Sequence, residues 1–252
     1  MKPLIPILLL SIFVSGCQAS TIQMSKDENT KLYSKIQDPI YGKVHSFQFE
    51  SECGNLERNS QSAKETKGTW FGSDCEQNRS VRSEISEKGR QQPKEAWYRW
   101  NVYLPNDFPI QPGGKLTLGQ FHNGECPHVS LISPGGSRDY GMMYFETLKT
   151  GGQWNCETTQ RIPFYSIQRL RGKWTEFVMF ARWSNKSDGL FQIYIDGEQV
   201  LDYKGRTLTK GKENSNYVKV GIYQCCNGDN PILPASALFT TPERSTESLL
   251  PK

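Results

Sequence analysis

The sequence lacks the features that several large protein classes require. Hydrophobic residues make up 36% and charged residues 22% of the 252 positions, against roughly 45–50% and 25% in an average globular domain. This composition excludes a protein with several membrane spans and a coiled coil. Zinc-finger, phosphate-binding-loop and aromatic RNA-binding signatures are missing. The formal charge of +4 permits an acidic partner, but nothing in the sequence indicates a nucleic acid.

Metal-binding patterns are also missing. The chain has three histidines, His45, His122 and His128, and neither CxxC nor HxH spacing occurs. We therefore expect no structural metal held by His and Cys. A structural calcium ion has no diagnostic ligand spacing here, although the sequence remains compatible with one.

Helical periodicity is absent over any long stretch, whereas rings and turn residues are common. Aromatic residues make up 12% of the chain, beside 22 glycines and 14 prolines, which is too aromatic for a disordered protein. Short segments alternate between two faces and end at Gly, Pro, Asn or Asp, and Asp196-Gly197 predicts a tight hairpin turn. This pattern indicates an all-β fold, a single antiparallel β-jelly roll or sandwich. Strands are predicted over residues 43–50, 80–86, 96–104, 115–122, 128–132, 140–147, 174–183, 190–195, 198–203 and 216–224.

The N-terminus is typical of a bacterial targeting segment. Met1-Lys2 is a short basic start, residues 4–14 are almost wholly apolar, and Val14-Ser15-Gly16-Cys17 resembles the lipobox of lipoproteins. The apolar run is too short for a permanent membrane span. We predict lipid attachment at Cys17, with an ordinary cleaved signal as the alternative.

The predicted organisation follows from this segment. We expect a signal peptide over 1–16, a polar tether over 17–39 and one domain over 40–252. Gln18 follows the cysteine, where an Asp would resemble an inner-membrane retention signal. We therefore expect an outer membrane lipoprotein of a Gram-negative bacterium, periplasmic or surface-facing, and a monomer held to the membrane by its lipid.

Six cysteines follow the predicted signal peptide: Cys53, Cys75, Cys126, Cys156, Cys225 and Cys226. In an oxidising compartment an even number predicts up to three disulfides. The partners stay open, although adjacent Cys225 and Cys226 are expected to bond elsewhere because a disulfide between neighbours is strained.

Three predicted strands carry unusual polar residues on one face. Side chains two positions apart on a strand point the same way, so the apolar residues define the core face. Alone, an Arg–Glu pair would be a surface ion pair and a single histidine a structural one. Together the polar faces predict a concave groove with a cation, an amide, an imidazole and phenols. They hold Arg82 and Glu84 on the first strand, Gln120 and His122 on the second, and Tyr217, Lys219 and Tyr223 on the third, where Gly221 leaves a gap.

These segments resemble the three motifs of β-jelly-roll polysaccharide lyases. Alginate lyases of this fold carry R-[ST]-E-L, Q-[IV]-H and Y-F-K-A-G-x-Y, and the heparin lyase I and glucuronan lyase group carries related versions. The stretch 172–198 resembles the second group more closely. That group ends in one more strand, for which residues 235–239 are the candidate. The matching motifs are Arg82-Ser83-Glu84, Gln120-Phe121-His122 and Tyr217-Val218-Lys219-Val220-Gly221-Ile222-Tyr223.

The resemblance implies β-elimination from a uronic-acid polymer. Arg82 and Gln120 would neutralise the carboxylate beside the proton that is removed. His122 would take the C5 proton and Tyr223 would protonate the leaving O4. For the opposite C5 configuration Tyr223 would serve as both base and acid, because nearby cations lower the pKa of a phenol.

The remaining motif residues are expected to bind substrate or to support the site: Tyr217, Lys219 and Glu84, the last holding Arg82 or Lys219 in place. Arg138, Lys149 and Arg161 are candidates for outer subsites, with solvated surface as the alternative. Residues 96–104 alternate between two ring-rich faces without indicating which lines the groove. The mechanism requires no redox or organic cofactor.

The sequence leaves the polymer open. A glucuronate or iduronate polymer ranks first, from the 172–198 stretch, and alginate next, from the tyrosine motif. A hydrolase would need two facing carboxylates, but Glu84 and Glu87 point to opposite faces of a regular strand. A non-catalytic carbohydrate-binding surface lipoprotein is the alternative, because a jelly roll alone does not imply catalysis.

Overall fold

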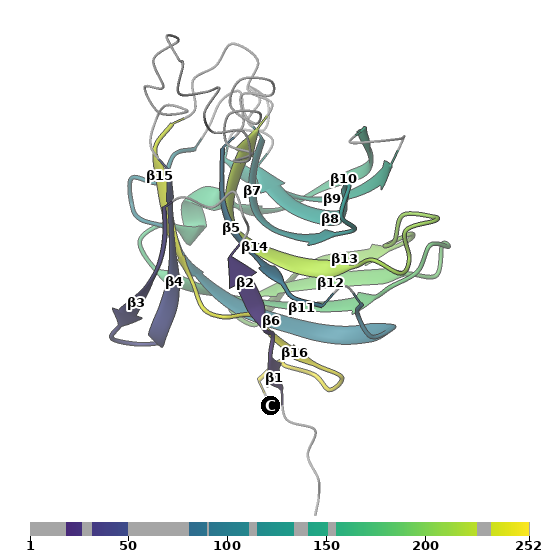
Figure 1. The fold of residues 1–252 in the computed structure, drawn as a ribbon, viewed down its shortest axis with the longest axis horizontal. Helices are drawn as coiled ribbons and strands as arrows, with labels where there is room; N and C mark the ends of the chain where they lie inside the picture. The colour runs from purple at the N-terminus through teal and green to yellow at the C-terminus, as the bar shows by residue number, and fades with distance from the viewer. Residues whose placement is uncertain are drawn as a thin grey trace, which may run out of the picture.

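A computed structural model describes residues 19–26, 32–49, 81–89, 91–110, 115–133, 141–150, 155–225 and 233–251. Two antiparallel sheets, of nine and seven strands, form a β-jelly roll in these residues (Figure 1). This confirms the predicted all-β fold. Among the described residues the one helix is the short 3-10 helix η1 (Ile167–Leu170). No helix in this part of the chain is long and apolar enough to cross a membrane.

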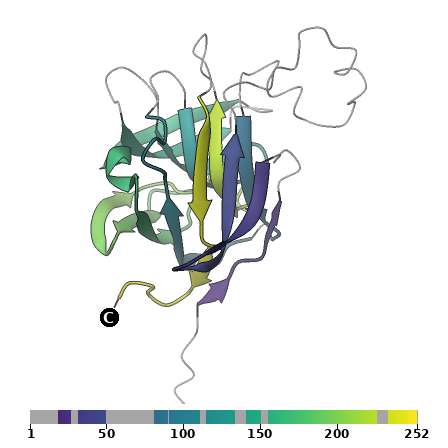
Figure 2. The same ribbon diagram turned by 90° about the vertical axis from the view of Figure 1, so that its left-hand side faces the viewer.

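The nine-stranded sheet runs in the order β13-β12-β11-β6-β15-β4-β3, with β16 paired to β6 and to β1. Strand β15 from the C-terminal part lies beside β4 from the N-terminal part (Figure 2). The strands are β1 (Ser20–Thr21), β3 (Leu32–Asp38), β4 (Gly42–Phe49), β6 (Glu95–Tyr103), β11 (Trp174–Arg182), β12 (Leu190–Ile195), β13 (Glu198–Lys204), β15 (Ala235–Phe239) and β16 (Glu243–Ser245).

The seven-stranded sheet runs in the order β10-β9-β8-β7-β14-β5-β2 and carries all three motifs. Strand β14 lies between β7 and β5, although the three strands are far apart in the sequence. The strands are β2 (Met24–Lys26), β5 (Val81–Glu87), β7 (Lys115–His122), β8 (Pro127–Ser133), β9 (Met142–Thr150), β10 (Cys156–Ser166) and β14 (Tyr217–Cys225).

Each of the ten predicted strands is present, with ends shifted by a few residues at most, and 235–239 is strand β15. The Asp196-Gly197 hairpin is confirmed, because both residues have the positive φ, 50° and 84°, that a tight hairpin turn requires. Strand β10 escaped prediction because most of its side chains are exposed, so its sequence shows no apolar alternation.

The expected tether over 17–39 does not hold for the residues described there. Strand β3 pairs with β4 along its whole length, β2 pairs with β5, and Ile22 is buried in the core. Edge strands are joined through backbone hydrogen bonds and need few apolar side chains, so a polar sequence can still form them. The predicted signal peptide and Cys17 lie outside the described residues.

Aromatic rings fill the space between the sheets. Phe121 of β7 is fully buried, with its ring centroid 4.7 Å from that of Trp183 and 4.8 Å from that of Tyr98. Strand β6 buries Ala96, Tyr98, Trp100 and Val102 in this core and turns the alternate residues outward from the nine-stranded sheet. Neither ring-rich face of 96–104 therefore lies on the outer face of the motif-bearing sheet.

One disulfide is present among the described residues, between Cys126 and Cys156. It joins the turn after β7 to the start of β10. The side chains of Cys53, Cys75, Cys225 and Cys226 lie outside the described residues, so their predicted pairing stays a prediction.

Candidate functional site

The registers of three neighbouring strands bring the predicted site residues together on one face. Residues directly opposite each other in antiparallel strands share a face and lie within contact range. On β14 the intervening Val218, Val220 and Ile222 are fully buried in the core, as predicted. The registers pair Tyr223 with Arg82, Gly221 with Glu84, Lys219 with Gln120 and Tyr217 with His122.

Glu84 anchors the centre of this face. Its carboxylate lies 3.0 Å from Lys219 Nζ and accepts a 2.7 Å hydrogen bond from Gln120 Nε2. The Glu84 and Lys219 side chains are 1% and 4% exposed. A carboxylate this deeply buried is tolerated because a cation and a donor compensate it. The expected contact with Lys219 is present, and Glu84 also orients the Gln120 amide.

Arg82 and Tyr223 form a cation–π pair at one end of the face. Arg82 Cζ lies 4.7 Å from the centroid of the Tyr223 ring, and both residues are partly exposed. A guanidinium at this distance is attracted to the ring.

His122 lies at the other end, partly exposed and held in one orientation. Its Nδ1 accepts a 2.9 Å hydrogen bond from the backbone N–H of Gly124, and the Tyr217 hydroxyl oxygen lies 3.2 Å from the same nitrogen. Because Nδ1 accepts, the neutral ring carries its proton on Nε2. His122 therefore presents an N–H donor from Nε2.

The turn that contacts His122 is itself well supported. The Asn123 side-chain oxygen accepts hydrogen bonds from the backbone N–H groups of Glu125 and Cys126, at 2.9 and 2.8 Å. Cys126 is cross-linked to Cys156 on β10. The turn, and with it the tautomer of His122, is therefore held by local hydrogen bonds and by a covalent bond.

The other two histidines have structural roles. His45 contacts Tyr33 and Thr241 through its two ring nitrogens, and His128 contacts the backbone of Ser215 and Thr209. Burial lowers the pKa of each to about 4. They are buried, neutral rings, whereas His122 lies partly exposed on the polar face.

Gly221 allows two strands to approach closely. A Cβ at this position would lie 2.2 Å from the Ser83 carbonyl oxygen, and its φ of +136° favours glycine. The β14–β7 register also shifts between Val220 and Tyr223. The gap expected at Gly221 is therefore closed on one side by the backbone of β5, and the glycine sets the spacing of Glu84 from β14.

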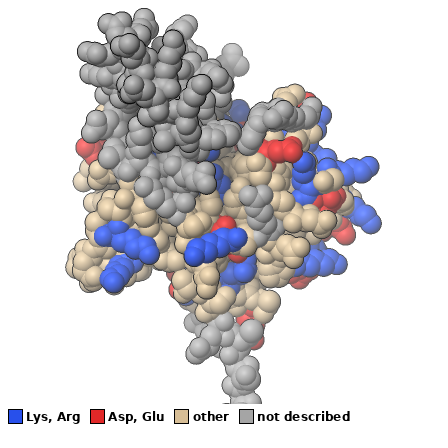
Figure 3. All heavy atoms as spheres, viewed as in Figure 1, with Lys and Arg blue, Asp and Glu red and all other residues tan. Residues whose placement is uncertain are grey.

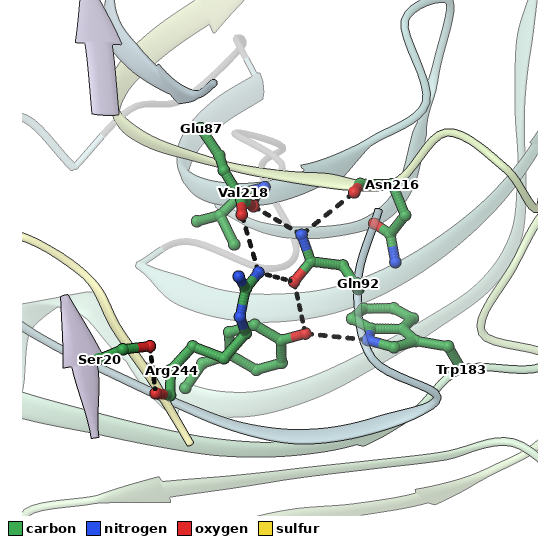
Figure 4. Close-up of polar contacts among 8 residues, drawn as sticks. Ser20, Glu87, Gln92, Trp183, Asn216, Val218 and Arg244 are labelled. Atoms are coloured by element: carbon green, nitrogen blue, oxygen red, sulfur yellow. Dashed lines mark hydrogen bonds and ion pairs between the residues drawn. The ribbon is translucent and has the colours of Figure 1, made fainter. Parts of the chain in front are cut away.

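A buried polar network fixes the start of β14 from behind (Figure 4). Glu87 accepts hydrogen bonds from Gln92 Nε2 at 2.6 Å and from the Val218 backbone N–H at 3.2 Å. Arg244 of β16 lies 2.7 Å from the other Glu87 oxygen and 2.8 Å from Gln92 Oε1. Since Val218 separates two motif residues, the network positions both. Glu87 contacts different partners from Glu84, as their opposite faces predict.

Sequence reasoning missed a second charged cluster on the same sheet. Glu146 of β9 is fully buried and pairs with Lys115 and with Arg161. The available signal was a single acidic residue inside an otherwise apolar strand. Of the other proposed outer residues, Lys149 forms an exposed pair with Glu157, and Arg138 lies outside the described residues.

The charged surface outside the polar face is mixed in sign. Figure 3 shows Lys and Arg side chains beside Asp and Glu on the flank formed by β8–β10 and β12–β13. Among the described residues, no group of three or more His, Cys, Asp or Glu could hold a metal ion.

Residues 23–244 match the sequence model of the family described as Polysaccharide lyase. The chain belongs to this family. The protein is therefore a lyase that acts on polysaccharides. A search of curated protein sequences finds no match.

Solved polysaccharide lyases share the fold of the chain. An endo-β-1,4-glucuronan lyase of the fungus Trichoderma reesei has a TM-score of 0.60 at 15% identity, covering 93% of this chain and 92% of that one. An alginate lyase of Pseudomonas aeruginosa has a TM-score of 0.50 at 15% identity, covering 87% and 88%. A family 7 alginate lyase in complex with substrate has a TM-score of 0.51 at 14% identity, covering 88% and 85%.

Proposed function

We propose that this lyase cleaves a polymer of D-configured uronic acids by β-elimination, with D-glucuronate the preferred unit. The observation that carries the proposal is the set of a guanidinium, an amide, an imidazole and a phenol on one face of β5, β7 and β14. Groups of these kinds suit elimination from a uronate, because the carboxylate must be neutralised, a base must take the C5 proton and an acid must deliver a proton to O4.

Arg82 and Gln120 would bind the uronate carboxylate. The guanidinium provides parallel N–H donors. The Gln120 amide has two N–H groups, one of which is used by Glu84, so the second can point to substrate. These donors stabilise the enediolate that forms when C5 loses its proton, and removing one typically costs about 10²–10³ in rate.

Tyr223 would serve as both base and acid. As a phenolate, favoured by the Arg82 guanidinium 4.7 Å from the ring centroid, it takes the C5 proton. The electron pair then forms the C4–C5 double bond, the C4–O4 bond breaks, and the new phenol returns the proton to O4. The hydrogen bond from Gly124 to His122 Nδ1 supports this assignment over a histidine base, because Nδ1 already accepts a hydrogen bond and Nε2 of the neutral ring carries a proton.

This assignment selects the stereochemistry. One group can exchange both protons only when the C5 hydrogen and O4 lie on the same side of the sugar ring. D-glucuronate and D-mannuronate meet this condition, whereas L-iduronate and L-guluronate place the two on opposite sides. The fold shared with a glucuronan lyase favours D-glucuronate over D-mannuronate.

The test is a panel of polymers of each uronate, followed by the ultraviolet absorbance of the unsaturated product. We expect product from a D-glucuronate or D-mannuronate polymer, and little from polymers of the L-epimers. Tyr223→Phe should lower kcat by roughly 10²–10⁴-fold, as removing an acid–base group does, while the variant still binds the polymer. Product from the L-epimers alone would contradict a tyrosine base, and wild-type enzyme that binds a polyuronate without releasing product would contradict β-elimination from uronates.

We also propose that lipid on Cys17 holds the enzyme, as a monomer, on the outer membrane and that catalysis needs no added cofactor. Cys17→Ser should release the protein from the membrane fraction and prevent labelling with a fatty acid. Activity that survives dialysis against a chelator is the expected result for the cofactor proposal.

A further inference from the structure

The polar row of the proposed site continues across the rest of the sheet. In the strand registers Gln120 lies opposite Ser130, Ser130 opposite Glu146, and Glu146 opposite Arg161. These side chains therefore share the face that carries the motif residues. With strands spaced roughly 4.8 Å apart, Arg161 lies about 14 Å from Gln120. A chain of several sugar rings, and not a single ring, would cover that distance.

The far end of the row holds more positive than negative charge. Glu146 is fully buried. Its Oε2 lies 2.6 Å from Lys115 Nζ, and its Oε1 lies 2.7 Å from Arg161 Nε. One cation would neutralise the carboxylate, so the second leaves a net charge of one. The Lys115 and Arg161 side chains are 24% and 44% exposed, whereas that of Glu146 has no exposure. Solvent, or a ligand, meets the cations and not the anion.

Ser130 places a hydroxyl between this cluster and Gln120. The residue is 1% exposed, and its Oγ has no hydrogen-bond partner within the part of the chain that the structure describes. A buried hydroxyl without a partner costs free energy. A donor in this state, next to two cations held by one carboxylate, suits an anionic group that accepts hydrogen bonds.

We propose that Lys115, Ser130 and Arg161 form a distal anion subsite, which binds a carboxylate or a sulfate ester several sugar units from the bond that is cleaved. The inference rests on the proposed function of the same face. Glu146 is its positioning residue, because it holds both cations toward the row. The subsite makes long chains better substrates than short ones.

The test compares the wild type with Arg161→Gln and Lys115→Gln on uronate oligosaccharides of increasing length and on the polymer. Lys149→Gln is the matched control, because it breaks an exposed ion pair between the same two strands, β9 and β10. In the wild type kcat/KM should rise when the oligosaccharide becomes long enough to reach the subsite. Arg161→Gln should raise KM for long chains about tenfold, the loss of affinity typical of one charged hydrogen bond. Its kcat, and its KM for the shortest substrates, should equal those of the wild type.

Sulfated and unsulfated polymers separate the two sources of the anion. If only the sulfated polymer loses affinity in the variants, the subsite takes a sulfate, and a loss with both assigns it a carboxylate. A length dependence that is the same in wild type and Arg161→Gln would overturn the subsite. Absence of product with every polyuronate would instead overturn the proposed function. Polymer binding measured by calorimetry still tests the subsite in that case, since equal affinity of wild type and variant refutes it.

Discussion

Replacing Glu84 by Gln tests the centre of the site. Glu84→Gln keeps the volume of the side chain but removes the negative charge 3.0 Å from Lys219 Nζ. The Lys219 side chain is 4% exposed, so its buried charge loses the carboxylate that lies 3.0 Å away. Breaking a buried pair in this way typically costs about 3–5 kcal/mol. We expect the free energy of unfolding at neutral pH to fall by that amount.

Activity should fall as well, because the same carboxylate orients the amide that binds substrate. Glu84 accepts the hydrogen bond of Gln120 Nε2 at 2.7 Å. A misplaced donor for the developing charge is expected to cost about 10²-fold in kcat. The assay is the initial rate of unsaturated product, with enzyme confirmed as folded by circular dichroism before each measurement.

Two controls separate burial from charge. Lys173→Gln breaks an ion pair with Asp196 whose side chains are 50% and 44% exposed, and it should cost about 0–1 kcal/mol. The double variant Glu84→Gln with Lys219→Met removes both charges of this pair, so stability should recover in part while activity does not. The reasoning is refuted if Glu84→Gln costs no more than Lys173→Gln, or if its turnover equals that of the wild type.

Three further predictions concern elements around the site. Burial lowers the pKa of His128 to about 4, against about 6.5 in the unfolded chain. The unfolded state therefore takes up the proton first, and stability should fall as pH drops from about 6.5 toward 4. Denaturant titrations of His128→Gln should lack this part of the pH dependence. Replacing Cys126 and Cys156 by Ser opens a loop with a sequence separation of 30 and should lower the free energy of unfolding by about 3–4 kcal/mol. An unfolding midpoint of the wild type that is equal with and without reductant would contradict this prediction. Gly221→Ala places a Cβ 2.2 Å from the Ser83 carbonyl oxygen. Strain and overpacking should lower the free energy of unfolding by about 2–6 kcal/mol, which a thermal melt would show as a lower Tm than that of the wild type.

Strands with one apolar face could be predicted, and strands without one could not. The alternation of Val218, Val220 and Ile222 was enough to place Lys219 and Tyr223 on the opposite face, since side-chain direction on a strand is a local property. Strands β3 and β10 have mostly exposed side chains. Backbone pairing at a sheet edge holds them, and backbone hydrogen bonds leave no pattern in a sequence.

The residue types of the site could also be predicted, but not their contacts. Alternation indicated that His122 faces outward, yet the N–H of Gly124 that orients its ring depends on the fold of the following turn. Glu146 remained unnoticed because its two cations come from β7 and β10. Contacts between residues far apart in a chain arise from strand order, which local patterns do not encode.

The amino-acid order by itself determined which side chains turn away from the core on each strand, because that depends on alternation between neighbours. Tertiary structure alone decided that β14 lies between β5 and β7, and so that groups from three distant segments share one surface. It also decided which nitrogen of His122 holds the proton. Both outcomes depend on nonlocal pairing, in which the burial of a whole sheet face selects one register among many.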